Sequence, residues 1–173
     1  MVNEVLISEE QIAKRVAELG TQITEDYKGE PLVLIGILKG SVPFMADLIR
    51  KIDLDVTIEF MQVSSYFGGT KSSGTVKIVK DIDIDLTDKN VMIVEDIVDS
   101  GNTLAYLKSY FQNRGCKTLK VATFLDKPAR RKVALEADYV GFTIDDLFII
   151  GYGLDLDQKY RHLPYISWVK ETD

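Results

Sequence analysis

The sequence is poor in the residues that form disulfides and zinc sites. Its 173 residues include one cysteine, Cys116, and one histidine, His162. A single cysteine has no partner within the chain, and one cysteine with one histidine cannot complete a structural zinc site, so neither kind of staple is expected. This composition is typical of a reduced, intracellular protein, and we expect a cytoplasmic location.

Long apolar runs and an excess of basic charge are also missing. The N-terminal segment MVNEVLISEE is acidic, and no later segment approaches the roughly 20 apolar residues of a membrane span. The chain has 21 Lys and Arg against 27 Asp and Glu, a net charge of -6. Since nucleic-acid affinity comes mainly from Lys and Arg that neutralise phosphates, we expect neither a membrane nor a nucleic-acid partner.

What the sequence does contain is an alternation of apolar strands with amphipathic helices. Ser8-Glu9-Glu10-Gln11 has the form of a capping box and predicts a helix. The segment LVLIGIL, residues 32–38, is apolar throughout, which is typical of a strand covered on both faces. The same patterns predict strands over 55–66, 76–84, 91–98, 117–126 and 138–144, and helices over 44–52, from Leu104 to near Gly115, and over 129–137. This alternation implies parallel β-α-β units, so the predicted fold class is α/β with a parallel central sheet.

The stretch VMIVEDIVDSGNTL, residues 91–104, carries the strongest functional signal. An apolar strand runs into three acids, Glu95, Asp96 and Asp99, and then into a tract of small residues that opens a helix. Ligands of open α/β sheets bind beyond the carboxyl ends of the strands, where helix N-termini attract anions, so the tract predicts a monophosphate pocket. The acids can accept hydrogen bonds from sugar hydroxyls, hold Mg²⁺ through water, or move a proton. A capped helix with solvated acids is the simpler alternative, but the density of the pattern favours transfer of a phosphorylated sugar.

This stretch resembles the phosphoribosyl-pyrophosphate binding motif of the type I phosphoribosyltransferases, two acids after an apolar strand and then a D-[ST]-G-x-T loop. LIGILKGS, VSSY, FLDKPARR and DLFIIGYGLDLDQKYRHLPYI are similar, in order and spacing, to the 6-oxopurine branch of hypoxanthine-guanine phosphoribosyltransferase type. The likeness extends from about Leu6 to Trp168. It implies a type I phosphoribosyltransferase domain over 1–173, with helices flanking a central parallel sheet. It also implies a small hood from the N-terminal residues and about 145–173, and assembly as a homodimer or homotetramer.

The resemblance assigns the ribose and phosphate side of the site by matching positions. Glu95 and Asp96 would take the ribose hydroxyls with Mg²⁺ nearby, and Asp99 would be the general acid or base at N7 of the purine. Backbone N–H groups would hold the 5-phosphate in the loop of Ser100, Gly101, Asn102, Thr103 and Leu104. The pyrophosphate would meet Lys39 and Gly40, after a cis peptide bond between Leu38 and Lys39, and also Arg161.

The resemblance also assigns the purine side and a lid. Lys127 matches the donor to the exocyclic O6, Phe148 the stacking aromatic, and Ile149 a backbone contact to the base edge. Asp155 matches a second metal ligand with a backbone carbonyl near the base. The lid over about 65–76 would begin with Ser65 and Tyr66. From the residues alone, simpler interpretations are a solvated charge for Lys127, a core position for Phe148, a routine turn for LKGS and a surface hairpin for the lid.

The implied reaction joins N9 of a 6-oxopurine to C1 of phosphoribosyl pyrophosphate and expels pyrophosphate, with Mg²⁺ as the cofactor. Hypoxanthine, guanine and xanthine remain open in their ranking. An alternative from another class is a regulatory protein of the same fold that binds nucleic acid. Such a protein should display a basic face, whereas this chain is acidic.

Overall fold

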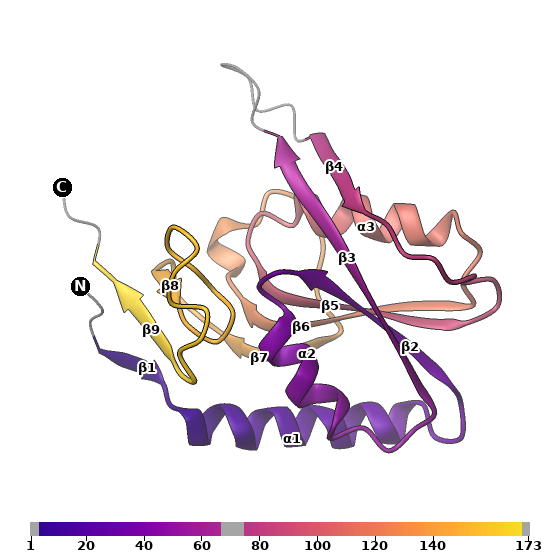
Figure 1. Ribbon diagram of the computed structural model, residues 1–173, viewed down its shortest axis with the longest axis horizontal. Helices are drawn as coiled ribbons and strands as arrows, with labels where there is room; N and C mark the ends of the chain where they lie inside the picture. Colours follow the sequence, from indigo (N-terminus) through magenta and orange to yellow (C-terminus); the bar gives the residue numbers. More distant parts are fainter. Residues whose placement is uncertain (1–3, 67–74, 171–173) are drawn as a thin grey trace.

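The computed structural model describes residues 4–66 and 75–170, which form two sheets and the helices that cover the larger one (Figure 1). A six-stranded sheet has the order β4-β3-β2-β5-β6-β7, and a three-stranded sheet has the order β1-β9-β8. In chain order the elements are β1 (Val5–Ile7), α1 (Glu9–Asp26), β2 (Leu32–Leu38), α2 (Val42–Ile49), β3 (Val56–Tyr66), β4 (Thr75–Lys80), β5 (Asn90–Val98), α3 (Asn102–Gln112), β6 (Thr118–Asp126), the short 3-10 helix η1 (Pro128–Arg130), β7 (Tyr139–Thr143), β8 (Phe148–Ile150) and β9 (Ile166–Val169).

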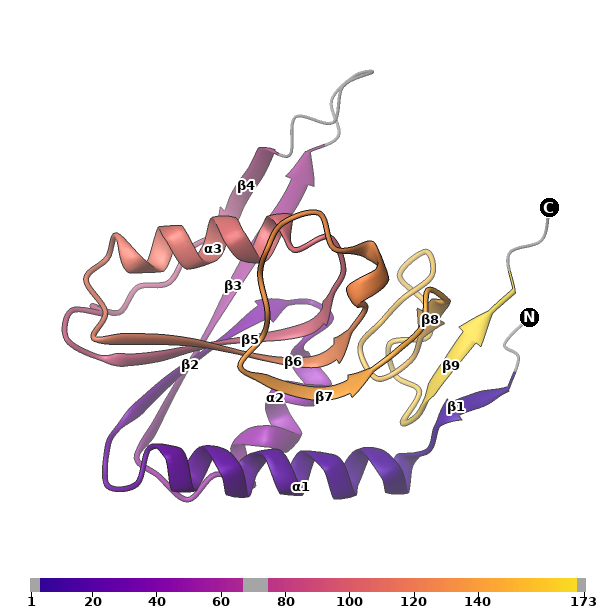
Figure 2. The same cartoon turned by 180° about the vertical axis from the view of Figure 1, so that it is seen from behind.

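The six-stranded sheet confirms the predicted α/β class. Strand β2 pairs in parallel with β3 and β5, β5 with β6, and β6 with β7, while β4 pairs antiparallel with β3. Helices α1 and α2 cover one face and α3 the other, as the two opposite views show (Figures 1 and 2). The apolar strand β2 therefore contributes Leu34 to the core cluster under α1 and α2, and Ile35 to the cluster under α3. Burial on both faces explains why this strand is apolar at every position.

The helices follow the predicted capping and spacing. The Ser8 side chain accepts from the Gln11 backbone N–H while the Gln11 side chain accepts from the Ser8 N–H, so the predicted capping box is formed at the start of α1. Leu104, Leu107 and Phe111 of α3 are buried at the predicted three- and four-residue spacing. The predicted strand over 76–84 is shorter than expected, because β4 ends at Lys80.

The predicted helix over 129–137 is wrong. Only the single turn η1 is helical, and the chain continues without regular structure until β7. The backbone N–H groups of Lys132 and Val133 donate to the carbonyl of Ser100, at 2.9 and 3.4 Å, and are not used in a helix. Tertiary hydrogen bonds to the loop after β5 thus override the helical pattern of the sequence.

Helix α1 also closes one edge of the six-stranded sheet. Arg15 donates through Nε to the carbonyl of Gly141, at 2.9 Å, and through Nη2 to that of Val140, at 2.7 Å. Both acceptors belong to the edge strand β7. The guanidinium therefore supplies partners to backbone groups that a neighbouring strand would otherwise take.

The three-stranded sheet stands beyond the carboxyl ends of β5, β6 and β7, and the described chain begins and ends there (Figure 2). Strand β9 joins β1 from the start of the chain to β8, both in antiparallel pairing. The space between this sheet and the carboxyl ends of the central strands is where α/β proteins bind their ligands. Within residues 4–66 and 75–170, no helix is long and apolar enough to cross a membrane.

Candidate active site

The loop after β5 and the end of that strand form one cavity. Its volume is about 320 Å³, and it is lined by Ile37, Val63, Glu95, Asp96, Ile97, Val98, Asp99, Ser100, Gly101, Thr103 and Leu104. Gly101 has φ +85°, a left-handed conformation that favours glycine, and stands directly before α3. The cavity therefore combines the predicted acids with a helix N-terminus that can receive an anion.

Of the two adjacent acids at the end of β5, Glu95 is buried and Asp96 is partly buried. Desolvation raises the pKa of Glu95 well above its usual range, and the neighbouring Asp96 carboxylate adds to the shift. Burial likewise raises the pKa of Asp96 to about 6, although its hydrogen bonds with backbone N–H groups and the charge of Arg161 act in the opposite direction. Two poorly solvated carboxylates side by side repel each other, and a cation or donor hydroxyls placed between them would relieve that repulsion.

The loop after β2 touches these acids. The peptide bond between Leu38 and Lys39 is cis, as the resemblance implied. A Cβ on Gly40 would lie 1.8 Å from Oδ2 of Asp96, and a Cβ on Gly153 would lie 1.9 Å from the carbonyl oxygen of Gly40. The backbone at Gly40 is thus enclosed between β5 and the segment that follows β8, with no room for a side chain on either side.

A charged cluster joins this loop to the segment between β8 and β9. Arg161 pairs with Oδ1 of Asp155 at 3.3 Å and donates to the Gln158 side chain at 3.1 Å and to the Gly153 carbonyl at 2.6 Å. Lys39 donates to the same Gln158 oxygen at 3.3 Å. Among the described residues, the buried Nε of Arg161 has no hydrogen-bond partner. A buried, unpartnered donor near one further cationic group, the ammonium of Lys39, can bind an anion from solution.

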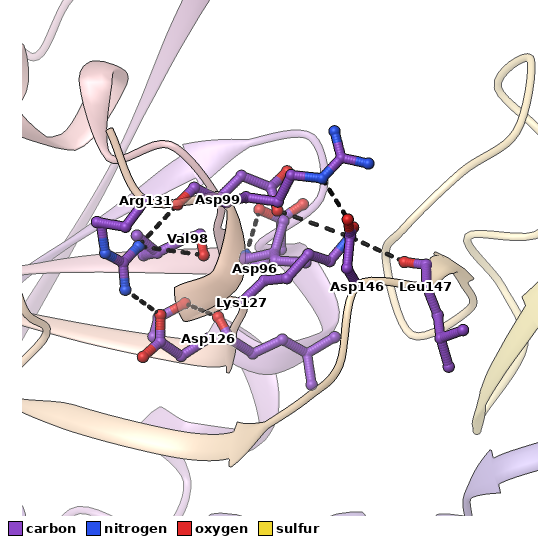
Figure 3. Close-up of polar contacts among 12 residues, drawn as sticks. Asp96, Val98, Asp99, Asp126, Lys127, Arg131, Asp146 and Leu147 are labelled. Atoms are coloured by element: carbon purple, nitrogen blue, oxygen red, sulfur yellow. Dashed lines mark hydrogen bonds and ion pairs between the residues drawn. The ribbon is translucent and has the colours of Figure 1, made fainter. Parts of the chain in front are cut away.

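The lysine at the end of β6 connects the first cavity to a second one. Nζ of Lys127 donates to the carbonyl of Leu147 at 2.8 Å and lies 3.7 Å from the Asp99 carboxylate and 4.0 Å from that of Asp146 (Figure 3). Only 8% of Lys127 is exposed, so the simpler interpretation as a solvated charge is wrong. The second cavity, of about 350 Å³, is lined by Lys127, Arg130, Asp146, Leu147, Phe148, Trp168, Val169 and Lys170.

The aromatic at the start of β8 presents its side chain outward. Phe148 is 41% exposed, whereas Ile149 and Ile150 after it are buried. The simpler interpretation of Phe148 as a core residue is therefore wrong. An exposed aromatic in the second cavity offers a face on which a planar ring can stack.

The structure brings the predicted residues together in three adjoining groups. The three acids line the first cavity with all of Ser100–Leu104 except Asn102. Lys39, Asp155 and Arg161 contact Gln158, and Gly40 lies beside Gly153 in the same region. Lys127 and Phe148 line the second cavity. The side chain of Ile149 belongs to the core and leaves only its backbone for a ligand. Ser65 and Tyr66 pair through the backbone with β4, and the rest of the predicted lid, residues 67–74, lies outside the described residues. Gln158 and Asp146 escaped sequence reasoning, because in DLDQKY and IDDL they carry no spacing signal.

The carboxylates fit a divalent cation of the Mg²⁺ type. Oxygen ligands suit this ion. The raised pKa values of Glu95 and Asp96 come mainly from burial and secondly from a neighbouring carboxylate, and a bound cation would favour the ionised form of both groups. Within the described part of the chain, no three His, Cys, Asp or Glu side chains gather into one metal-ligand cluster. Mg²⁺ usually keeps waters or substrate oxygens among its ligands, so one or two carboxylates such as Glu95 and Asp96 can be its protein ligands.

Comparisons with known proteins agree with this geometry. A family model described as a phosphoribosyl transferase domain matches residues 4–157. Curated hypoxanthine-guanine phosphoribosyltransferases from Bacillus subtilis and Staphylococcus aureus are 50% and 51% identical to the chain over 169 residues, 98% of this chain and 94% of each relative. A crystal structure of a hypoxanthine-guanine phosphoribosyltransferase from Bacillus anthracis is similar with a TM-score of 0.95, at 54% identity, over 98% of this chain and 100% of that chain.

Proposed function

The chain belongs to the phosphoribosyl transferase family, and on this premise we propose that it transfers the 5-phosphoribosyl group of phosphoribosyl pyrophosphate to N9 of hypoxanthine or guanine. It is a transferase of purine salvage with the type I phosphoribosyltransferase fold. The products of the proposed reaction are IMP or GMP and pyrophosphate. Xanthine, another 6-oxopurine, is a candidate third substrate and is included in the test below.

One observation carries the choice of a 6-oxopurine. The buried ammonium of Lys127 lies 3.7 Å from Asp99, and in the same cavity Phe148 presents an exposed ring. An ammonium has three donors, and here the carbonyl of Leu147 takes one of them. A ring that stacks on Phe148 can accept another at a carbonyl oxygen, whereas the amino group of adenine at that position offers no acceptor.

The acid beside Lys127 is placed to handle the purine proton. Asp99 has about half of its side chain exposed and stands between the two cavities, next to Lys127. In the proposed reaction the Asp99 carboxylate exchanges a proton with N7 of the purine while N9 bonds to the sugar carbon. The ammonium of Lys127, 3.7 Å from this carboxylate, orients the base through O6.

The remaining groups hold the phosphorylated sugar. We assign the 5-phosphate to the backbone N–H groups of Ser100–Leu104 and the ribose hydroxyls to Glu95 and Asp96, which line one cavity. The pyrophosphate is assigned to the backbone at Lys39 and Gly40 and to Arg161, whose buried Nε has no partner among the described residues. Binding both ends of the substrate fixes the sugar carbon between the leaving group and the base.

Several further features belong to the same proposal. Mg²⁺, held by Glu95 and Asp96 and at a second position by Asp155, would supply charge neutralisation for the departing pyrophosphate. The three-stranded sheet with the residues around it is proposed as the hood, and residues 65–76 as the lid. A single thiol is compatible with the proposed cytoplasmic location. We also propose that the protein assembles as a homodimer or homotetramer. We propose no nucleic-acid partner.

The test is an absorbance assay of the purified protein with Mg²⁺ and phosphoribosyl pyrophosphate. Hypoxanthine, guanine, xanthine and adenine are supplied in separate reactions, and a reaction with a chelator in place of Mg²⁺ is the control. We expect nucleotide formation with hypoxanthine and guanine and none with adenine. Folded protein that is silent with all four bases, or that prefers adenine, would contradict the proposal, and retention on RNA at low salt would then test the regulatory alternative.

A further inference from the structure

The irregular segment after η1 lies against the loop that follows β5, on the side away from the cavity. Arg131 donates through Nη1 to the carbonyls of Asp99, at 2.9 Å, and of Val98, at 3.4 Å, and its Nη2 contacts the carboxylate of Asp126 (Figure 3). The next two residues, Lys132 and Val133, donate through their backbone N–H groups to the carbonyl of Ser100. Arg131 does not line the first cavity.

These contacts provide hydrogen-bond donors to three successive carbonyls of the loop. The oxygens of Val98, Asp99 and Ser100 all accept hydrogen bonds from residues 127–133, since the Lys127 N–H also donates to Val98 at 3.0 Å. In a trans peptide the carbonyl and the following N–H point in opposite directions, and these three peptide bonds are trans. The N–H groups of Asp99, Ser100 and Gly101 therefore point away from the donors of residues 127–133, and these three residues line the cavity. Successive N–H groups on one side of a turn form an anion-binding concavity.

The Arg131 guanidinium is packed tightly enough to hold the loop after β5 in one position. The Arg131 side chain is 15% exposed and that of its partner Asp126 is 16% exposed, so the charge pair is shielded from solvent. A Cβ on Gly101 would lie 2.9 Å from Cγ2 of Val133 and 3.3 Å from Cδ of Arg131, which shows how closely the segment packs on the loop. The planar fork of arginine can serve two carbonyls and a carboxylate at once, which a single ammonium does with poorer geometry.

We infer that Arg131 is a positioning residue for the phosphate-binding loop. It does not touch the substrate but holds the peptides of Val98 and Asp99 so that the loop N–H groups point at the bound phosphate and the Asp99 side chain faces the base. The inference rests on the proposed function, because the phosphate is that of phosphoribosyl pyrophosphate. Arg131 is not among the predicted site residues. Its position shortly after Pro128 indicates, from the sequence alone, only a charge on the surface.

The test compares Arg131→Met with the wild type in binding and in turnover. Binding of phosphoribosyl pyrophosphate with Mg²⁺, without purine, is measured by calorimetry, and the KM values for both substrates are measured in turnover. We expect about a ten- to hundredfold weaker binding of phosphoribosyl pyrophosphate, the loss typical of hydrogen bonds from a charged donor. The KM for hypoxanthine at saturating phosphoribosyl pyrophosphate should change by less than about threefold.

Arg114→Met is the matched control. Arg114 also joins a carboxylate, Asp81 at 3.3 Å, to a backbone carbonyl, that of Ile84 at 3.1 Å, but it follows the opposite end of α3. It should lower Tm to a similar extent and leave the binding of phosphoribosyl pyrophosphate unchanged. If Arg131→Met lowered Tm alone, or if both variants weakened binding equally, Arg131 would be merely structural and the inference would be overturned.

Two further measurements separate geometry from charge and guard against misfolding. A lost orienting contact persists at high salt, whereas a lost long-range attraction is screened, so the ratio of affinities should be the same at about 0.05 and about 0.5 M salt. If the ratio of wild-type to Arg131→Met affinity approached one at high salt, the inference would be overturned. Should Arg131→Met not fold, Asp126→Asn tests the same support and should weaken binding in the same direction by a smaller factor. Wild-type protein that binds phosphoribosyl pyrophosphate but transfers it to no purine would refute the proposed function while leaving the Arg131 comparison valid.

Discussion

The loop after β5 and the loop after β2 lie at the carboxyl ends of adjacent parallel strands, yet they are held in different ways. Hydrogen bonds from residues 127–133 hold the carbonyls of the loop after β5 from outside the cavity. The loop after β2 is held by close packing. A Cβ on Gly40 would collide with Asp96, and a Cβ on Gly153 would collide with the carbonyl oxygen of Gly40. Hydrogen bonds to its carbonyls orient the loop after β5, whereas the loop after β2 is fixed by neighbours that pack directly against a glycine.

The difference predicts which changes each loop tolerates. A loop held through its backbone carbonyls can accept different side chains at its surface, provided that the donors behind it remain. A loop enclosed between two neighbouring segments cannot accept even a methyl group, because protein interiors have no spare volume at such contacts. The two loops meet at Asp96, which belongs to the cavity of the first and touches the glycine of the second.

A change of chemistry that leaves both loops intact should have the largest effect. Asp99→Asn keeps the shape of the side chain but cannot exchange the purine proton, so the transfer rate should fall by about 10²- to 10⁴-fold. Binding of phosphoribosyl pyrophosphate should stay within about threefold, because the loop backbone is unchanged. Rapid-quench rates and calorimetry measure the two quantities separately. Full activity with every accepted base would refute the acid–base role.

Adding one methyl group to the enclosed loop should come next. Gly40→Ala places a Cβ where Oδ2 of Asp96 lies 1.8 Å away, so the loop or the carboxylate has to move. A displacement of about 1 Å at a reacting centre can lower kcat/KM by about a hundredfold, and we expect a loss of this order. Steady-state kinetics with hypoxanthine measure the loss.

Gly101→Ala is the matched variant in the loop after β5. There the nearest atom to the new Cβ is a side-chain carbon of Val133, at 2.9 Å, which can shift, and the main cost is the left-handed conformation at φ +85°. The free loop relieves this cost of about 1–2 kcal/mol by leaving the left-handed conformation, and ligand binding has to restore it, so the affinity for phosphoribosyl pyrophosphate should fall by roughly tenfold. An equal or larger loss in Gly101→Ala than in Gly40→Ala would break the comparison between the loops.

The acid shared by the two loops predicts a pH dependence of stability. Burial raises the pKa of Asp96 from 3.8 to about 6, so the folded protein keeps this proton to a higher pH than the unfolded chain does. Between these values the folded state binds more protons, and its contribution to stability is lost as pH rises through about 6. The free energy of unfolding of the metal-free protein should fall by about 1–3 kcal/mol relative to Asp96→Asn over this window. Denaturant unfolding of both proteins at several pH values measures it, and equal slopes would contradict the assignment.

The smallest effect is expected at an exposed side chain of the hydrogen-bonded loop. Asn102 is exposed at the start of α3, and its backbone N–H donates to Oγ of Ser100 at 3.3 Å. Asn102→Ala keeps that N–H, so the KM for phosphoribosyl pyrophosphate should change by no more than about twofold. A tenfold change would show that this loop acts through its side chains, contrary to the comparison.

The elements of the six-stranded sheet could be predicted from the sequence, because their signals are local. An apolar strand that runs into acids and a glycine places Glu95, Asp96 and Asp99 at a βα junction, and the structure puts all three on one cavity. The capping box at Ser8 and the buried positions of α3 likewise follow from short-range patterns. These predictions needed only the geometry of a strand or a helix.

The parts that could not be predicted depend on contacts between distant residues. The helical pattern over 129–137 gave way to hydrogen bonds with Ser100, about thirty residues earlier in the chain. Without the resemblance, Lys127 and Phe148 would have passed as a surface charge and a core residue, because their partners come from other elements. Gln158, between Lys39 and Arg161, and Arg131, behind the loop after β5, became visible only when the chain was folded.

The hydrogen bonds from Arg15 to the edge strand β7 bear on how copies of this chain can meet. An unpaired sheet edge is a template on which another chain can add a strand, and such addition leads to fibres as readily as to defined oligomers. Because the guanidinium occupies the carbonyls of Val140 and Gly141, a strand arriving at β7 would first have to displace helix α1. Strand addition at β7 is therefore disfavoured, and Arg15 acts as a safeguard against polymerisation through this one edge, whereas β4 at the opposite edge has no such cover from Arg15.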